Sequence, residues 1–244
     1  MVTVLRDAPR QIAVRVKDKV MNEKRFAAIL KRGLSPYKLS VYHLLRERAI
    51  ADSAAYAEQH LNTAMIFNED VKLWDFAAST AKVEGGLILE FGVFKGRSIT
   101  RFAQIFQDTT LHGFDSFEGL AENWTGYHLA KGAFNLGGAM PAVPDNVTLH
   151  KGWFNETLPD FLKANKAKLR LCHVDCDTYE SSLYVLTQIS KSLVKGSVIV
   201  FDEYYGYPNW KFGEYRAWQE VCAAKKINYR YIAFANMQVA VEVI

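Results

Sequence analysis

The chain has 244 residues, of which 50% are hydrophobic and 13% aromatic, so it is long enough to bury one sizeable core. No apolar stretch approaches the ~20 residues of a membrane helix, and residues 1–7 carry no apolar core of a secretory signal. We therefore expect a cytoplasmic protein with no membrane partner. Its three cysteines (Cys172, Cys176 and Cys222) fit a reducing compartment and exclude a disulfide framework.

The net charge of +4 is unevenly distributed along the chain. Residues 1–50 hold twelve Lys or Arg and four Asp or Glu, a balance of +8, whereas residues 51–244 have a balance of −4. A basic arm can bind nucleic acid or attract an anionic substrate. Here apolar residues such as Ile12, Val16 and Val20 interleave with the charges. This pattern favours the solvated face of an amphipathic helix, so nucleic acid is not an expected partner.

The N-terminal third of the chain has a helical pattern. Three helices are predicted at residues 9–32, 37–50 and 52–82, the last with a break near residues 68–70. We expect residues 1–80 to form a helical extension or cap, and residues 81–244 to form the main domain.

From Leu87 onward, short apolar runs alternate with helical stretches of about 10–15 residues, which is typical of a parallel sheet with crossover helices. Strands are predicted at 87–91, 111–114, 147–151, 169–175 and 197–201, and helices near 97–107, 156–166, 179–194 and 211–225. Only three residues separate the last two predicted strands, 229–234 and 238–243, so these must pair as an antiparallel hairpin. The expected fold class is α/β, with a doubly wound, Rossmann-like, seven-stranded sheet, a C-terminal antiparallel hairpin and the N-terminal helical extension.

Residues 116–146 form an unusually long connection between two of these strands. They contain five glycines and two prolines, and a connection of this length is typical of a lid or a binding loop. Four aromatic residues in it are candidates to cover a ligand: Phe117, Trp124, Tyr127 and Phe134.

The first chemical motif is a strand that ends in a glycine turn and then a helix. Gly92 and Gly96 allow the backbone to pass close to a ligand, and the helix start offers free N–H groups. Asp115 ends the next strand, where a carboxylate can accept both hydroxyls of a ribose. The dinucleotide pattern G-x-G-x-x-G would need glycine at Phe94 and Arg97. The motif therefore indicates a nucleoside cofactor and disfavours a dinucleotide.

The second motif is a pair of strands that each run into carboxylates. One ends at Asp175 and the other at Asp202 and Glu203. Buried carboxylates are unfavourable unless a cation or donors satisfy them. Because these oxygens would meet at one edge of a parallel sheet, they predict a site for Mg²⁺, Mn²⁺ or Ca²⁺ rather than zinc.

Three nearby residues have two interpretations each. Asp177 fits the metal site, and equally fits a helix N-cap with Glu180 three residues on. His173 lies within a strand, which favours a hydrogen-bonded core histidine over a ligand. Trp153 follows the third strand and could flank a purine or anchor the next helix.

Together these residues resemble a class I S-adenosylmethionine-dependent methyltransferase, and more narrowly the macrocin O-methyltransferase (TylF-like) family. The resemblance covers about residues 80–244. It rests on five ordered segments: Glu90–Gly96, Phe114–Leu120, Gly152–Phe154 with Thr157–Pro159, Val174–Tyr179, and Val200–Tyr204.

The resemblance implies roles for individual residues. Glu90, Gly92, Gly96 and Ser98 would line the methionine end of S-adenosyl-L-methionine, Asp115 with Ser116 would hold the ribose, and Trp153 would lie near the adenine. Asp175 would lie at the cofactor and, with Asp202 and Glu203, would bind Mg²⁺. The family usually has two aspartates where this chain has Asp202-Glu203. Catechol-type relatives have a lysine base where this chain has Thr178.

The expected reaction is metal-assisted methyl transfer to a hydroxyl of a small molecule, typically a sugar or a glycosylated natural product. Asp175, Asp177 and the lid residue His128 are the candidate catalytic residues that could take the hydroxyl proton. Two alternatives remain at this point: an NAD-dependent oxidoreductase, and a non-catalytic nucleoside- or RNA-binding protein with a basic N-terminal arm. A homodimer is the default expectation for assembly.

Overall fold

The computed structural model describes residues 40–244. The predicted helix 9–32 and most of the basic N-terminal segment lie outside the described residues. From Arg46 to Ile244 the chain forms one compact unit, which holds the sheet and the candidate site.

Eight strands form one sheet in the order β1-β7-β8-β6-β5-β2-β3-β4. All neighbouring strands are parallel except β8, which runs antiparallel to β6 and β7. The bounds are β1 (Met65–Phe67), β2 (Leu87–Phe91), β3 (Leu111–Asp115), β4 (Val147–Lys151), β5 (Leu169–Val174), β6 (Val198–Phe201), β7 (Tyr229–Ala235) and β8 (Gln238–Val243). The predicted α/β class and the C-terminal hairpin are confirmed.

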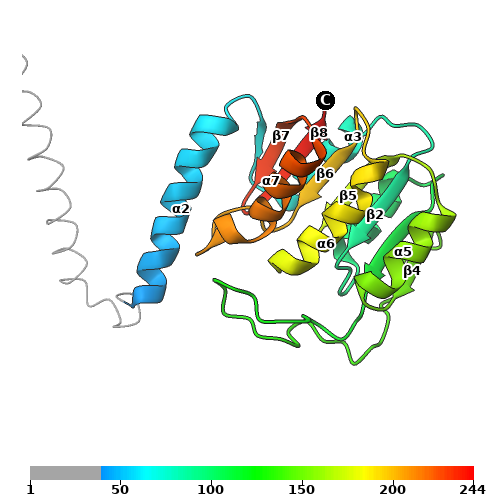
Figure 1. Ribbon diagram of the computed structural model, residues 1–244, viewed down its shortest axis with the longest axis horizontal. Coiled ribbons are helices and arrows are strands. Elements are labelled where there is room, and N and C mark those ends of the chain that lie inside the picture. The colour runs from blue at the N-terminus through cyan, green and yellow to red at the C-terminus, as the bar shows by residue number, and fades with distance from the viewer. Residues whose placement is uncertain (1–39) are drawn as a thin grey trace, which may run out of the picture. The chain divides into compact units, whose positions relative to one another are not determined.

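Helices cover both faces of the sheet, as a doubly wound fold requires. One face carries α5 (Phe154–Ala164), α6 (Tyr179–Ile189) and α7 (Glu214–Lys225), and the other carries α3 (Asp70–Thr80) and α4 (Arg97–Ile105) (Figure 1). The central strands are therefore shielded from water on both sides, and all five residues of β2 and all four of β6 are buried. This explains why β6 is a continuous apolar run and why β2 is apolar except at Glu90, instead of showing an alternating pattern.

The structure differs from the sequence prediction before residue 80. The sequence predicts separate helices at 37–50 and 52–82, but one continuous helix, α2 (Val41–His60), runs through residue 51. The predicted helix 52–82 is in turn interrupted by β1. The predicted break near residues 68–70 is confirmed, because α3 begins at Asp70. β1 has three residues and pairs with β7 at the sheet edge, so it raises the strand count to eight. A strand this short is stabilised by its neighbour and carries no pattern of its own.

Residues 116–146, all of them described, contain no helix or strand. In Figure 1 this loop, which we call the lid, runs past the carboxyl ends of the parallel strands. It folds back on itself, since the N–H of Leu120 donates to the carbonyl of Ala133 at 2.9 Å. The lid also contacts the segment after β6, where the rings of Trp124 and Tyr207 lie 5.8 Å apart, edge to face. These contacts give the loop a defined conformation over the strand ends.

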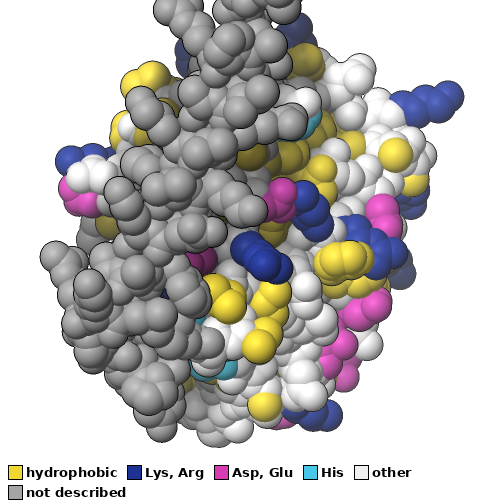
Figure 2. Space-filling view, turned by 90° about the vertical axis from the view of Figure 1, so that its left-hand side faces the viewer, with side chains coloured by type: hydrophobic (Ala, Val, Ile, Leu, Met, Phe, Trp, Pro, Cys, Tyr) yellow, Lys and Arg dark blue, Asp and Glu magenta, His cyan; other side chains and the backbone are white. Residues whose placement is uncertain are grey.

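In the described part of the chain, no helix has the length and apolar composition needed to span a membrane. On the face shown in Figure 2, the Lys and Arg side chains of the described residues are scattered among hydrophobic and neutral ones.

Candidate active site

The turn after β2 brings the ends of β2 and β5 into backbone contact. Gly92 has a φ of +92°, and a Cβ built there would lie 1.7 Å from the carbonyl oxygen of Asp175. The N–H of Asp175 in turn donates to the carbonyl of Phe91 at 2.8 Å. Only glycine combines this backbone conformation with such a close approach. The glycine thus determines where Asp175 stands.

Asp115 ends β3 and holds the glycine loop through its carboxylate. Its Oδ2 accepts the backbone N–H groups of Val93 (2.9 Å) and Phe94 (2.8 Å), and its Oδ1 accepts that of Phe117 (2.7 Å). Phe94 and Phe117 have φ values of +46° and +59°, which are strained for bulky residues. Since a carboxylate offers about four acceptor positions, about one remains for a ligand hydroxyl.

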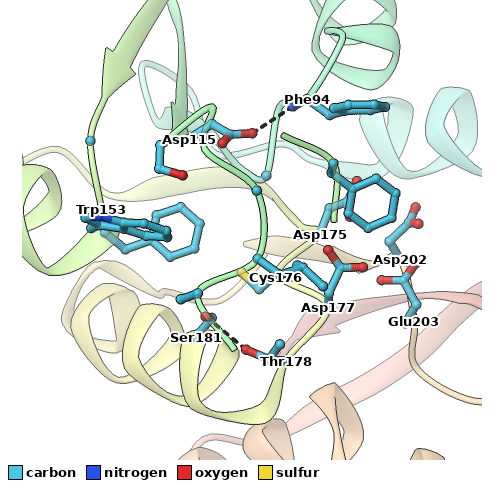
Figure 3. Close-up of a pocket in the computed structure, with 18 of the residues that line it drawn as sticks. Phe94, Asp115, Trp153, Asp175, Cys176, Asp177, Thr178, Ser181, Asp202 and Glu203 are labelled. Atoms are coloured by element: carbon cyan, nitrogen blue, oxygen red, sulfur yellow. Dashed lines mark hydrogen bonds between the residues drawn. The ribbon is translucent and has the colours of Figure 1, made fainter. Parts of the chain in front are cut away.

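Four carboxylates from two neighbouring strand ends point into one pocket (Figure 3). Asp175 and Asp177 follow β5, and Asp202 and Glu203 follow β6. Two groups of possible metal ligands result, and in each group the ligand atoms lie within 4.8 Å of one another. The first consists of Asp175, Asp177 and Glu203, and the second of His173, Asp175 and Asp202. Asp175 is common to both groups. Parallel pairing of β5 with β6 produces this cluster.

Asp177 belongs to the pocket and does not cap a helix. The N-cap of α6 is Thr178, whose backbone is extended (φ −107°, ψ 150°), and the Thr178 hydroxyl donates to Ser181 Oγ at 3.0 Å. Asp177 has a φ of +60° and is 8% exposed. The helix-cap interpretation is therefore wrong, because the chain turns at Asp177 and aims its carboxylate toward the other acids.

Burial and mutual repulsion make most of these acids hard to ionise. Burial, with the nearby charge of Asp202, raises the pKa of Asp175 and of Glu203 well above the ordinary range. The same two causes raise the pKa of Asp177 to about 8. Burial also acts to raise the pKa of Asp202, but the close contact and charge of His173 outweigh it and leave that pKa lowered.

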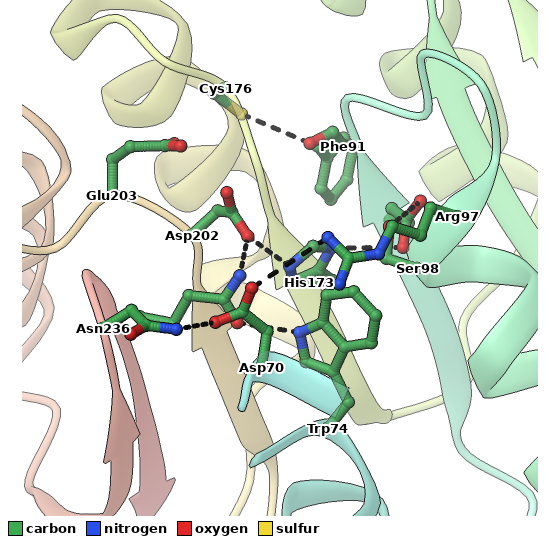
Figure 4. A network of polar contacts seen from close by, with 12 residues as sticks. Asp70, Trp74, Phe91, Arg97, Ser98, His173, Cys176, Asp202, Glu203 and Asn236 are labelled. Atoms are coloured by element: carbon green, nitrogen blue, oxygen red, sulfur yellow. Dashed lines mark hydrogen bonds and ion pairs between the residues drawn. The ribbon is translucent and has the colours of Figure 1, made fainter. Parts of the chain in front are cut away.

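His173 connects the acidic pocket to the sheet interior (Figure 4). Its ring is fully buried, with Nδ1 3.2 Å from Glu90 Oε2 and Nε2 3.5 Å from Asp202 Oδ1. Burial alone would lower the pKa of His173, but its two carboxylate partners raise it well above the ordinary value. Asp202 also accepts a hydrogen bond from Gln238, whose amide oxygen accepts Trp74 Nε1–H at 2.8 Å. His173 is thus a core histidine that hydrogen-bonds Glu90 through Nδ1 and forms an ion pair with Asp202, while its Nε2 has no hydrogen-bond partner in the described structure.

Replacing His173 by leucine should lower the free energy of unfolding by about 3–5 kcal/mol, because Glu90 and Asp202 would lose their cation. Urea unfolding followed by circular dichroism measures this change. His128→Leu, an exposed change in the lid, is the control and should shift stability by less than about 0.5 kcal/mol. A loss below about 1 kcal/mol in His173→Leu would contradict the ion-pair assignment.

The acidic groups also predict how stability depends on pH without divalent cations. In the folded protein the pKa values of Asp177 and Glu214 are both about 8, whereas unfolded carboxyl groups titrate near pH ~4. The folded state therefore holds extra protons between these values and loses them as the pH rises. His173, whose folded pKa is raised, acts in the same direction.

The free energy of unfolding should accordingly fall by about 2 kcal/mol between pH ~6.5 and ~8 for each extra proton held. Thermal unfolding in EDTA at several pH values tests this. A midpoint that stays constant or rises across the window would contradict it. Mg²⁺ should reduce the fall if the acids bind it.

The pocket has a volume of about 390 Å³, which suits a cofactor or drug-sized ligand. Eight predicted site residues line it: Gly92, Asp115, Ser116, Trp153, Asp175, Asp177, Asp202 and Glu203. The side chain of Trp153 stands on the side opposite the acids (Figure 3).

The other four predicted site residues lie outside this lining. Glu90 and Ser98 are buried, and the Ser98 hydroxyl donates to Glu90 Oε1 at 3.0 Å beneath the glycine turn. Gly96, with a φ of +78°, immediately precedes α4. His128 is exposed in the lid, with its ring 4.6 Å from that of Tyr127.

Sequence reasoning missed two features of the site. Phe94 lines the pocket beside Phe134, one of the four lid aromatics predicted to cover a ligand, with the two rings 5.3 Å apart, edge to face. In the sequence, Phe94 is notable only as a position where the dinucleotide pattern would require glycine. Glu214 is fully buried behind the acidic strand ends, and no local pattern indicated it, because its partners lie far away in the sequence.

Comparisons with known proteins agree with this geometry. Residues 89–204 match a family described as a methyltransferase domain. The calicheamicin methyltransferase CalS11 is similar in structure, with 25% identity, a TM-score of 0.59, and coverage of 71% of this chain and 78% of that one. No curated protein sequence matches the chain.

Two further solved structures share the fold. An apo structure of CalS11, described as a TDP-rhamnose 3'-O-methyltransferase, has 22% identity, a TM-score of 0.53, and coverage of 92% of this chain and 94% of that one. The O-methyltransferase NovP has 21% identity, a TM-score of 0.53, and coverage of 70% of this chain and 79% of that one.

The sheet with its C-terminal hairpin, the glycine turn with Asp115, and the matched domain define a class I S-adenosylmethionine-dependent methyltransferase. The solved structures that share its fold include O-methyltransferases. The oxidoreductase alternative is thereby set aside. The narrower macrocin-type resemblance stays a prediction.

Proposed function

We propose that this enzyme methylates a hydroxyl of a sugar or sugar-bearing small molecule, with a divalent cation at the acidic strand ends. The observation that carries the proposal is the pocket that joins four carboxylates to a nucleoside-type crevice. The similarity to CalS11 supports a sugar acceptor. A cytoplasmic location and a homodimer stay predictions.

The donor set fits a hard cation such as Mg²⁺. Asp175, Asp202 and Glu203 would hold it, and all three offer carboxylate oxygens. Glu203 Oε2 is buried and has no hydrogen-bond partner in the described structure. An unpaired buried carboxylate oxygen is unfavourable, which supports a positively charged ligand here. A bound cation would polarise the acceptor hydroxyl and lower its pKa.

The cofactor would occupy the crevice beside the glycine turn. S-adenosyl-L-methionine supplies an activated methyl group on a sulfonium, so the protein's task is positioning. Asp115 would accept a ribose hydroxyl with its free acceptor position, Ser116 stands beside it, and Trp153 would contact the adenine. Glu90 and Ser98 would support the turn at Gly92 from beneath.

Asp177 is the group that we propose to take the acceptor's proton. Its carboxyl lies in the pocket near Asp175 and Glu203, and its pKa of about 8 is close to working pH, as an efficient proton acceptor needs. Asp175 is an alternative, although a metal-bound carboxylate is a weaker base. His128 is less suited, because it is exposed and lies outside the lining.

The proposal is tested with a panel of nucleoside diphosphate sugars and S-adenosyl-L-methionine, assayed by mass spectrometry with EDTA or with added Mg²⁺. We expect a product 14 mass units heavier (one CH₂, about 14 Da, as O-methyl transfer requires) that EDTA suppresses and Mg²⁺ restores. Full activity on an identified acceptor after exhaustive chelation would exclude the metal role. Transfer only to acceptors that lack a sugar would exclude the acceptor class.

A further inference from the structure

Glu214 is the first residue of α7, and its side chain has 0% exposure. Its two carboxylate oxygens accept hydrogen bonds from two different loops. Oε1 accepts the backbone N–H of Cys176 at 3.3 Å, and Oε2 accepts that of Glu203 at 3.1 Å. One side chain thus bridges the segment after β5 and the segment after β6.

These two N–H groups stand at the acids of the site. Cys176 lies between Asp175 and Asp177, and Glu203 directly follows Asp202. Each bond fixes the orientation of a peptide unit, and that orientation sets the direction of the adjoining acidic side chains. The two strand ends are already joined by β5–β6 pairing and by the bond from the Asp202 N–H to the Val174 carbonyl (2.9 Å). The Glu214 bridge adds a second constraint further along both loops, where the acidic pairs stand.

A buried carboxyl at this position lowers the stability of the fold, which suggests that it is retained for function. Glu214 adds a fifth carboxyl to the four acids already gathered here, and an apolar or amide side chain would fill the space at lower electrostatic cost. In its ionised form, however, this side chain has two acceptor oxygens and no donor. It can receive two N–H groups from different loops at once, which glutamine cannot do without turning its own NH₂ toward a donor.

We propose that Glu214 is a positioning residue, which holds the two acidic strand ends at the separation that binds the divalent cation. This inference rests on the proposed metal-assisted function. Supporting residues behind metal ligands typically contribute 10–100-fold to metal affinity, and Glu214 acts here through the backbone rather than through the ligand side chains.

The test is Mn²⁺ binding by Glu214→Gln, measured by electron paramagnetic resonance, beside S-adenosylhomocysteine binding measured by calorimetry. We expect Mn²⁺ affinity to fall at least about tenfold, whereas affinity for S-adenosylhomocysteine changes less than about twofold. Amide hydrogen exchange should accelerate at Cys176 or at Glu203, because the single amide oxygen of glutamine leaves one of the two N–H groups without an acceptor. Glu220→Gln is the matched control, since this exposed glutamate of α7 bonds only Tyr179 and Arg216 among residues 40–244, and it should change none of the three readouts.

The outcomes separate this inference from the proposed function. If the wild-type enzyme binds no Mn²⁺, the metal role fails, and the inference fails with it. If the wild type binds Mn²⁺ and Glu214→Gln binds it equally well, only the inference is overturned. If Glu214→Gln does not fold, Glu214→Asp keeps the charge but is one methylene shorter. We expect it to bind Mn²⁺ several-fold more weakly than wild type, and equal binding would overturn the inference.

Discussion

Gly92→Ala should abolish methyl transfer and destabilise the fold, whereas Gly85→Ala should leave activity intact. The two glycines flank β2, and both have positive φ, +92° and +62°. Alanine at either position therefore incurs the same type of backbone strain, about 1–2 kcal/mol. The variants differ in what the new methyl group meets.

At Gly85 no atom of the described residues lies within 4 Å of the added Cβ, whereas at Gly92 the carbonyl oxygen of Asp175 would lie 1.7 Å away. The end of β5 must then move by more than 1 Å (about 1.5 Å to restore the normal contact distance). That movement would displace Asp175 and Asp177 and narrow the cofactor crevice. We expect Gly92→Ala to lose at least about 3 kcal/mol of stability, against about 1–2 kcal/mol for Gly85→Ala.

Thermal unfolding and calorimetric titration with S-adenosylhomocysteine measure both effects. In Gly92→Ala, binding should weaken by more than about 100-fold, since misplacement of about 1 Å has effects of that order. Wild-type affinity in Gly92→Ala would show that the backbone approach is not essential. A loss of affinity in Gly85→Ala as well would mean that strain alone explains the result.

Asp175→Asn should reduce kcat by about 100-fold or more and, in the absence of divalent cations, should raise the melting temperature. Asp175 belongs to both groups of candidate ligand atoms, so its loss should weaken the cation site and its Lewis-acid contribution, which is several kcal/mol. Its pKa is raised by burial and by Asp202 and Asp177. The folded state therefore resists ionisation of this group, and removing the charge relieves that repulsion.

A variant that loses activity but gains stability indicates that the replaced acid is retained for function at a cost in stability. We expect a gain of about 1–2 kcal/mol, or roughly 2–8 °C, in EDTA at pH ~8. Asp160→Asn, an exposed acid on α5, is the control and should change neither quantity. A fall in melting temperature for Asp175→Asn would indicate a structural role, and an unchanged kcat would remove Asp175 from the site.

The placement of the site was predictable because its signals are local. Apolar runs that end in Asp175 and in Asp202-Glu203 identify strands and their carboxyl ends, and parallel pairing then brings those ends together. The glycine turn is equally local, since Gly92 and Asp115 each follow a recognisable strand. These features need only a few consecutive residues to be recognised.

Other features depend on partners distant in sequence. Either Asp177 or Thr178 could be the N-cap of α6. The backbone turn at Asp177, with its positive φ, makes Thr178 the N-cap. Glu90, predicted at the methionine end of the cofactor, is buried beside His173 of the neighbouring strand, with its Oε2 3.2 Å from His173 Nδ1. β1 forms a strand because it pairs in parallel with β7 at the edge of the sheet.

The sequence by itself determined the alternation of strands and helices, the C-terminal hairpin and the two acidic strand ends, because periodicity and chain reversal are properties of short segments. Only the tertiary structure decided how the carboxylates are held. His173 forms an ion pair with Asp202, and Glu214 joins two residues that stand 38 and 11 positions before it, Cys176 and Glu203. The physical reason is that the stability of a buried charge depends on the atoms around it, and those atoms come together only when the chain has folded.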